Sequence, residues 1–593
     1  MKNDSKLLSG FGATIGFSDL LINPLKRLVA SRLAVAVALL VLVSVSAGCR
    51  SDSKNLRQVG PVVTPSGTFS GVQQQASTAA KTVNAFLGIP FAESASGELR
   101  WTNPVAKAPL GDFAATSFGP ACPQDTSWGG RIKGLRQDED CLTINVWTPT
   151  DPAPAGGFPV MFWIYGGAYL HGATADPLFS GASLAASQSV VVVTANYRIG
   201  ALGFLAGNVG NATFTGNYAL LDQQLALKWT QTNIASFGGN PNNVTLFGES
   251  AGAISTGVHL LSVPSSEPLF HAAIIESDPL GISLKTAAEQ SITGNAFAKA
   301  LNCGTSSDAA KCLRGIPIGS LIAAQQGADV MLAVSSATGI GRFTPWGPYL
   351  DGTFITQQPI DGAKKGALNK PTILGTVRNE AAVFISALPL SYFEKDSYSQ
   401  LINGDFGANG AAILAKAAYA TTSTAATNKA KYIELTTSRL LTCPTQAAMQ
   451  FAVASSSIPV YAFWFTHNSK WQANTLFLGI PECGEPNTAC HEAELPYVFN
   501  TPAAFVDPAG VPSTFTADEA ALSSAMQTYW GNFAKNHDPN IGGSTPVVWP
   551  RFSVNPKVSN YMVLDTSLTT VNALPDTYEC SFWDGLGYDA PKR

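Results

Sequence analysis

A serine between two glycines is the residue of this chain best suited to chemistry. Residues 244–253 read Val-Thr-Leu-Phe-Gly-Glu-Ser-Ala-Gly-Ala, so a short apolar run ends in Gly-x-Ser-x-Gly around Ser250. This order is typical of a nucleophile elbow, in which a strained turn between a strand and a helix exposes the serine hydroxyl. Gly248 and Gly252 leave out side chains where the backbone is crowded. The pattern predicts a nucleophilic Ser250, with the amide of Ala251 as an oxyanion donor.

A nucleophilic serine needs a histidine as its base, because the hydroxyl attacks only when a neutral imidazole takes its proton. The chain has six histidines, and three of them are candidates. His171 lies close to a glycine turn, His467 follows a strand-like run, and His491 stands in His-Glu-Ala-Glu-Leu-Pro-Tyr. The first two are equally well explained as polar residues at the rim of a pocket.

The base in turn needs a carboxylate that fixes its orientation. Glu380 follows directly after an apolar, strand-like segment, whereas Asp351 stands in Leu-Asp-Gly, which is more typical of a turn. Glu249 is adjacent to Ser250, but neighbouring residues of a strand face opposite sides. We therefore interpret Glu249 as structural and expect it to face away from the serine.

The elements that position these residues are buried strands alternating with helices. Five continuous apolar runs are typical of strands buried on both faces; they are residues 159–164, 189–194, 272–275, 371–375 and 460–465. Residues 217–232 and 517–533 have helical spacing, residues 62–90 look like an antiparallel start, and residues 411–420 are expected in a helical cap. The pattern predicts an α/β fold with a mostly parallel central sheet flanked by helices.

Composition narrows the functional classes. Of 593 residues, 46% are hydrophobic and 13% charged, which permits a large core and argues against disorder. The net charge is −4, and no basic run occurs outside the N-terminus, so nucleic acid is not expected as a partner. Without a linker or repeat after residue 60, residues 60–593 are predicted to form one catalytic domain.

The first 49 residues have the order of an export signal. Basic residues precede the apolar run 33–45, and Ser-Ala-Gly-Cys follows at 46–49. The run is shorter than the ~20 residues of a spanning helix. The ending resembles a bacterial lipobox, which would lipidate Cys49 and attach the protein to a membrane; ordinary cleavage after Ala47 is the alternative. We expect an exported protein, periplasmic or in the outer membrane as a lipoprotein if bacterial and otherwise secreted, with residues 50–59 as a linker.

Nine cysteines in an exported chain suggest four disulfides in addition to Cys49. The expected pairs bracket loops of different length, although spacing alone leaves the connectivity open; they are Cys122 with Cys141, Cys303 with Cys312, Cys483 with Cys490, and Cys443 with Cys580. A zinc site is the competing interpretation. It is disfavoured because no Cys-x-x-Cys pair occurs and the histidines are scattered.

Several segments, in the right order, resemble the type-B carboxylesterases, the α/β-hydrolase family that includes acetylcholinesterase. The resemblance covers roughly residues 60–585; its matching segments are 86–92, 139–146, 165–168, 196–206, 216–252, 374–380, 491–499, 530–534 and 538–540. It implies an α/β-hydrolase fold with a catalytic triad of Ser250, Glu380 and His491. It also implies an oxyanion hole of the amides of Gly167, Ala168 and Ala251.

Further expectations follow from the same resemblance. Three of the cysteine pairs correspond to disulfides common in eukaryotic relatives, while Cys483–Cys490 would be additional and would stiffen the loop of His491. Phe343 and Trp346 are candidates for the acyl pocket, with core packing as an equal alternative. No metal and no cofactor are required. The first disulfide loop carries only Trp128, at an offset different from the choline-stacking tryptophan of cholinesterases.

The predicted function is therefore hydrolysis of small hydrophobic esters with short or medium acyl chains. Two alternatives stay open within and outside the enzyme class. A cholinesterase-like or amide-directed hydrolase would use the same triad on another substrate. A binding or adhesion protein on the same fold would lack the triad, whereas Ser250, Glu380 and His491 are all present here.

Overall fold

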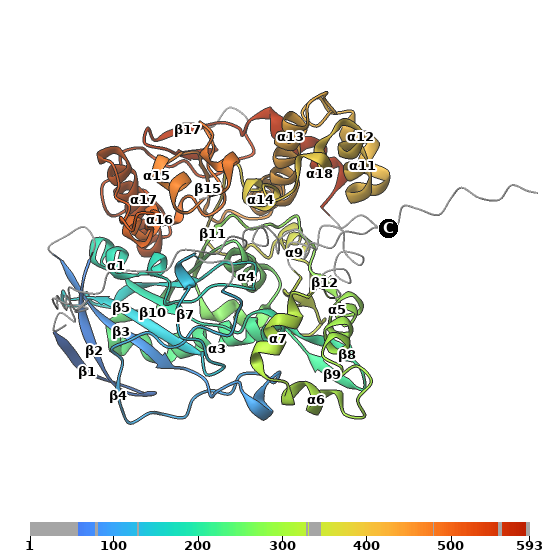
Figure 1. The fold of residues 1–593 in the computed structure, drawn as a ribbon. Helices are drawn as coiled ribbons and strands as arrows, with labels where there is room; N and C mark the ends of the chain where they lie inside the picture. Colours follow the sequence, from blue (N-terminus) through green and yellow to red (C-terminus); the bar gives the residue numbers. More distant parts are fainter. Residues whose placement is uncertain are drawn as a thin grey trace, which may run out of the picture.

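A mixed sheet of thirteen strands forms the centre of the protein (Figure 1). The computed structural model describes residues 57–588, apart from 77–80, 127–129, 328–329, 331–344, 478 and 556–559. The export segment 1–49 with Cys49 lies outside the described residues, as do Trp128 and Phe343. The first strand, β1, begins at Gln58, so residues 58 and 59 belong to the sheet and not to a linker.

The parallel middle of the sheet comes from the apolar runs of the sequence. Its strands, in spatial order, are β7 (Val191–Ala195), β6 (Phe158–Ile164), β10 (Gly239–Glu249), β11 (Ala272–Glu276), β14 (Thr372–Val377), β15 (Val460–Phe465) and β16 (Tyr561–Leu564), each parallel to the next. Strands covered on both faces are largely apolar. Every residue of β7, β11, β14 and β15 is accordingly buried.

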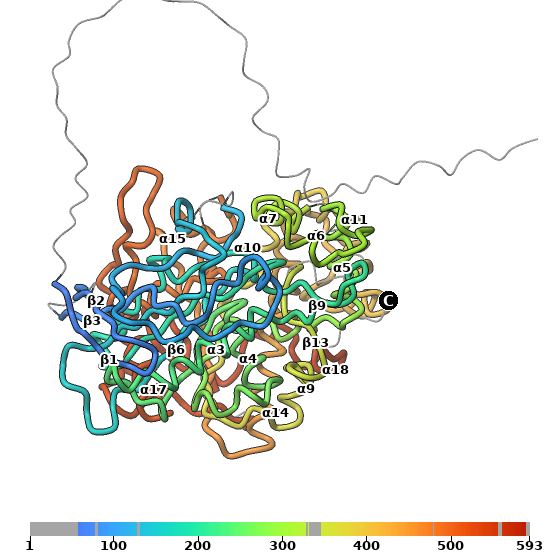
Figure 2. Tube along the Cα trace, turned by 90° about the horizontal axis from the view of Figure 1, so that it is seen from below, coloured from blue at the N-terminus to red at the C-terminus, as the bar shows by residue number. Residues whose placement is uncertain are grey.

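Antiparallel strands complete the two ends of the sheet. They are β1 (Gln58–Thr64), β2 (Gly67–Gln75), β3 (Thr82–Pro90) and β5 (Thr143–Pro149) at one end and β17 (Thr569–Val571) at the other, with β4 (Asp112–Ala114) paired in parallel with β2. In Figure 2, β1 to β3 lie at one end of the molecule, and the helices α5 (Ala287–Ala300), α6 (Ala309–Gly315) and α11 (Lys395–Phe406) lie at the other. The antiparallel start predicted for residues 62–90 is confirmed.

Helices flank the sheet. The helices α3 (Tyr218–Asn233), α4 (Ala251–Leu261) and α17 (Ala517–Asn536) all contact β10, the strand that leads to Ser250, and α1 (Ala182–Gln188) contacts α17. The helices expected at 217–232 and 517–533 are confirmed, whereas the segment 411–420 forms only the short helix α12 (Gly410–Leu414) before a turn. Among the described residues, no helix combines the length and apolar character needed to cross a bilayer.

Candidate active site

Ser250 occupies a sharp turn between β10 and α4. Its backbone has φ 55° and ψ −121°, a strained conformation for a residue other than glycine. The close packing predicted for the two glycines is present: a Cβ on Gly252 would lie 2.0 Å from the carbonyl oxygen of Ile164, and one on Gly248 would lie 2.5 Å from that of Gly252. Only glycine fits at these two positions, and the side chain of Ser250 stays half-exposed. The segment is a nucleophile elbow.

The turn after β6 lies directly against this elbow. A Cβ on Gly166 would lie 3.0 Å from Cβ of Ser250, and Gly167 has φ 104° with its missing Cβ against the carbonyl oxygen of His171. Ala168 is also left-handed, with φ 54°, although it has a side chain. Gly167 and Ala168 are half-exposed, so their backbone can approach a bound substrate. The two predicted oxyanion residues therefore flank the space beside Ser250.

His491 and Glu380 form a buried acid–base pair. Nδ1 of His491 lies 2.6 Å from Oε2 of Glu380, and the other carboxylate oxygen accepts a hydrogen bond of 2.8 Å from the amide of Val377. Since Glu380 accepts, the proton of the imidazole is assigned to Nδ1, which leaves Nε2 as the acceptor. Nε2 makes no hydrogen bond to any described residue. This is the tautomer that a general base requires.

Glu249 belongs to the site, and the prediction that it faces away was wrong. Its Oε1 lies 3.1 Å from Nε2 of His491, although the two groups are not aligned as a hydrogen bond. Glu249 is the last residue of β10, directly before the strained turn at Ser250, where the regular alternation of strand faces ends. The signal in the sequence was an acidic residue directly before the predicted nucleophile. Its partner, His491, lies 242 positions later, and no local pattern predicts such a tertiary contact.

A group of buried carboxyls surrounds this contact. Burial raises the pKa of Glu249 well above its ordinary value, and the nearby charges of Glu492, Glu494, Glu380 and Glu276 raise it further. Burial likewise raises the pKa of Glu494, and it raises that of Glu276 to about 8. Raised pKa values favour the uncharged form of these carboxyls. Glu249 therefore places a carboxyl with a raised pKa beside Nε2 of His491.

The rival candidates have other partners. Nδ1 of His171 lies 3.1 Å from the carbonyl oxygen of Asp125. His467 lies between Asp565 and Glu519, and these contacts outweigh its burial and raise its pKa to about 9. Asp351 accepts hydrogen bonds from the amides of the turn that follows it, as a turn residue does. None of the three contacts the acid–base pair in the hydrogen bonds of the described residues.

The two pocket candidates have different outcomes. Phe343 lies outside the described residues, so its expected role stays a prediction. Trp346 is fully buried, donates a hydrogen bond of 3.0 Å to the carbonyl oxygen of Gln325, and packs edge-on against Phe297 with ring centroids 5.4 Å apart. These are the contacts of a core residue, because large aromatic side chains fill interiors and bond their polar group there. Core packing, the second expectation for Trp346, fits this environment.

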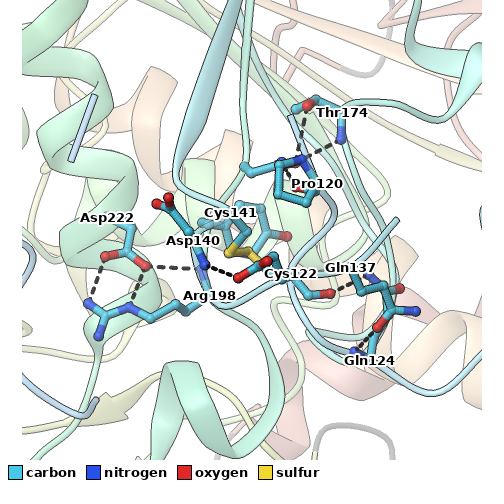
Figure 3. Close-up of a disulfide and its surroundings, with 12 residues drawn as sticks. Pro120, Cys122, Gln124, Gln137, Asp140, Cys141, Thr174, Arg198 and Asp222 are labelled. Carbon is cyan, nitrogen blue, oxygen red and sulfur yellow. Dashed lines mark hydrogen bonds and ion pairs between the residues drawn. A yellow bond between two sulfur atoms is a disulfide. The ribbon is translucent and has the colours of Figure 1, made fainter. Parts of the chain in front are cut away.

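The four predicted disulfides are formed. They join Cys122 to Cys141, Cys303 to Cys312, Cys443 to Cys580 and Cys483 to Cys490. Figure 3 shows the first of them beside the buried ion pair of Arg198 with Asp222, whose Nη2 and Oδ1 atoms lie 2.7 Å apart. These eight cysteines are therefore bonded in pairs and are not zinc ligands. In the part of the chain that the structure describes, no group of three or more metal-ligating side chains is present.

The large, mostly parallel sheet flanked by helices, with an elbow at the end of β10, defines an α/β-hydrolase. The model of the carboxylesterase family matches residues 58–583. The chain therefore belongs to this family, and it is a carboxylic ester hydrolase.

Individual relatives agree with this assignment. The chain is 32% identical to the cAMP-regulated D2 protein of Dictyostelium discoideum over 556 residues, which cover 93% of this chain and 97% of the relative. It is 33% identical to the acetylcholinesterase of Bungarus fasciatus over 532 residues, which cover 85% and 82% of the two chains. The structure resembles that of a thermophilic PNB esterase with a TM-score of 0.72 and 28% identity, covering 88% of this chain and 99% of the other.

Proposed function

We propose that the protein is an exported serine esterase that hydrolyses small hydrophobic esters with short or medium acyl chains through Ser250, His491 and Glu380. The observation that carries this proposal is the buried pair of His491 and Glu380, whose free Nε2 lies beside the residue that precedes Ser250. Carboxylesterase family membership supports the ester class. We also infer that residues 60–593, with the two preceding residues of β1, act as one catalytic domain.

The reaction needs only groups of this chain. Nε2 of His491 takes the proton of Ser250 while the serine oxygen bonds to the ester carbonyl carbon. The bond to the alcohol oxygen then breaks, and His491 gives its proton to the leaving alcohol. Water loses a proton to His491 as its oxygen bonds to the acyl carbon; the bond between that carbon and the serine oxygen then breaks, and His491 returns the proton to Ser250 as the carboxylic acid leaves. General-base help of this kind contributes about 10²–10⁴ in rate.

The negative charge that forms on the carbonyl oxygen is stabilised by the amides of Gly167, Ala168 and Ala251. Removal of one such donor typically costs about 10²–10³ in kcat. The side chain of Ala168 takes up room that a glycine would leave free near the acyl group. This fits a preference for short and medium acyl chains.

Export is supported by two independent features. The order of basic, apolar and small residues before Cys49 is typical of a signal segment. Four formed disulfides are typical of an oxidising compartment. Mass spectrometry of the mature N-terminus distinguishes a lipidated Cys49 from cleavage after Ala47, and an intact N-terminus on the cell-associated protein would contradict export.

Labelling with an organophosphonate probe tests the nucleophile. Purified protein with intact disulfides is treated with the probe, digested and mapped, with Ser250→Ala as the control. We expect one modified peptide, which contains Ser250, and no labelling of the variant. A series of p-nitrophenyl esters of rising chain length then gives the acyl preference. Absence of labelling in folded protein would refute the proposal and favour a binding protein on the same fold.

A further inference from the structure

The segment that carries His491 has little regular structure of its own. Between the end of β15 at Phe465 and His491, the described residues (all but 478) form only two short helices, α15 (Lys470–Asn474) and η10 (Pro481–Gly484). A base must nevertheless be held within about 0.5 Å of its working position. Contacts outside regular secondary structure must therefore supply the rigidity.

One set of contacts joins the residues immediately before the acid and the base. Asn379 precedes Glu380, Cys490 precedes His491, and the two form an isolated parallel bridge. The amide of Asn379 donates to the carbonyl oxygen of Ala489 at 2.8 Å, and the side-chain oxygen of Asn379 accepts from the amide of Ala489 at 3.2 Å. The backbone segments of Glu380 and His491 thus run side by side.

A second set of contacts returns from the other end of the loop. Cys483 is bonded to Cys490, and the preceding residue, Glu482, is held by two partners. Nζ of Lys429 lies 2.6 Å from one carboxylate oxygen of Glu482, and the hydroxyl of Ser386 donates to the other at 2.6 Å. Nζ of Lys429 also donates to the carbonyl oxygen of Ser386 at 2.9 Å.

Ser386 connects this second set of contacts to the segment that carries Glu380. It lies six residues after Glu380, at the end of the short helix α10 (Ala382–Ile385). Lys429 comes from α13 (Ala425–Thr437), and its side chain is 10% exposed. The side chain of Glu482 is 26% exposed, so the ion pair is partly shielded from solvent and is screened less than a fully exposed pair.

We infer that the Cys483–Cys490 disulfide and the Lys429–Glu482–Ser386 cluster position His491 against Glu380 by closing a ring of contacts around the acid–base pair. The ring runs from Glu380 through α10 to Ser386, across to Glu482, through the disulfide to Cys490, and from His491 back to Glu380. The inference rests on the proposed function, in which His491 is the base. No hydrogen bond, ion pair or disulfide of the described residues joins the disulfide or the Lys429–Glu482–Ser386 cluster to Ser250, so their members are positioning residues.

The size of the effect follows from the geometry of the reaction. A misplacement of about 1 Å at a reacting group can cost about 100-fold in rate. Without the disulfide, His491 keeps the bridge to Asn379 but loses the connection to Glu482. We expect kcat to fall by about 10-fold to 100-fold, with KM changed by less than about twofold, because the disulfide acts on the position of His491 and not on substrate binding.

The test compares two double variants. Cys483→Ser with Cys490→Ser opens the ring, and Cys303→Ser with Cys312→Ser opens a disulfide of similar span between α5 and α6, with separations of 7 and 9 residues. Steady-state kinetics with a p-nitrophenyl ester are measured for both and for wild type. A loss of kcat confined to the first variant supports the inference. Unchanged kcat in the first variant, or equal loss in both, overturns it.

Two further measurements keep the inference testable if the double-cysteine variant does not fold or if the wild-type protein shows no esterase turnover. Lys429→Met removes the cation of the cluster while keeping all disulfides, and unchanged kcat in this folded variant would overturn the inference. Hydrogen exchange needs no turnover: peptides covering 377–382 and 487–493 should exchange faster in the ring variants than in the control. Equal exchange rates in the ring variants and the control would overturn the inference. An inactive wild-type protein would count against the proposed function alone.

Discussion

Replacing Gly166 by alanine tests how closely the oxyanion turn must pack against the nucleophile. The added Cβ would lie 2.8 Å from both the carbonyl oxygen and Oε2 of Glu249, and 3.0 Å from Cβ of Ser250. Ordinary contact begins at 3.4 Å, so relief requires shifts of 0.6 Å (3.4 − 2.8) and 0.4 Å (3.4 − 3.0). Two of these atoms cannot move independently of the backbone, because the carbonyl oxygen of Glu249 belongs to it and Cβ of Ser250 is bonded directly to it. The turn must therefore move away from Ser250 by about half an ångström.

A shift of this size weakens the hydrogen bonds to the oxyanion. Donors that lie about 2.9 Å from the oxyanion would be displaced to nearly 3.4 Å, where a hydrogen bond is largely lost. We expect kcat to fall by about 100-fold, as for the removal of one donor. KM should change little, because these amides act mainly on the transition state. Overpacking should lower the free energy of unfolding by about 1–3 kcal/mol.

The assay combines steady-state kinetics on p-nitrophenyl butyrate, active-site titration with a phosphonate and urea denaturation. Gly404→Ala is the matched control, since Gly404 lies in α11 with no atom within 4 Å of its added Cβ. That variant should keep wild-type kcat and gain about 0.5–1 kcal/mol of stability. If folded Gly166→Ala retains kcat within about threefold of wild type, the packing argument for the oxyanion turn is refuted.

Three further predictions concern other contacts. Glu380→Gln should lower kcat by about 10³–10⁴ with the fold intact, because an amide no longer fixes the tautomer of His491; kinetics with circular dichroism check this, and a loss below tenfold would contradict it. The pKa of His467 is raised to about 9 in the folded protein, so its stabilising contribution is present below about pH 6.5 and is lost as pH rises through 9. Urea denaturation of wild type and His467→Gln should therefore differ most at pH 6 and least above pH 9, and a constant difference would argue against it. Asp222→Ala leaves the guanidinium of Arg198 buried without its carboxylate and should cost about 3–5 kcal/mol in urea denaturation, whereas a cost below 1 kcal/mol would show that water replaces the partner.

Much of the fold could be predicted because its strands leave simple patterns. The five apolar runs overlap β6, β7, β11, β14 and β15, since a parallel strand covered on both faces tolerates few polar residues. The elbow was predictable because only glycine fits on either side of Ser250. The helix expected at 411–420 ends earlier, at Leu414. An alanine-rich segment has a high intrinsic helix propensity, but tertiary contacts determine where the helix ends.

The site was harder to predict where residues meet through tertiary contacts. His491 and Glu380 carry no local pattern that pairs them, and the resemblance to a family, not the spacing, brought them together. The position of Glu249 beside His491 was missed because alternation along a strand does not hold at a strained turn. Trp346 was named as a pocket candidate but is buried in the core. The sequence around an aromatic residue does not tell whether that residue contacts substrate or fills the core.

The order of strands in the sheet has a consequence for when activity appears during synthesis. Ser250 follows β10, Glu380 follows β14 and His491 follows β15, so the three lie 130 and 111 residues apart along the chain. A growing polypeptide that has already folded its elbow and oxyanion turn still has neither acid nor base. Under the proposed function, its serine lacks a base until the segment after β15 has been added. With the triad proposed above, a nascent chain cannot hydrolyse esters before residue 491 has been added.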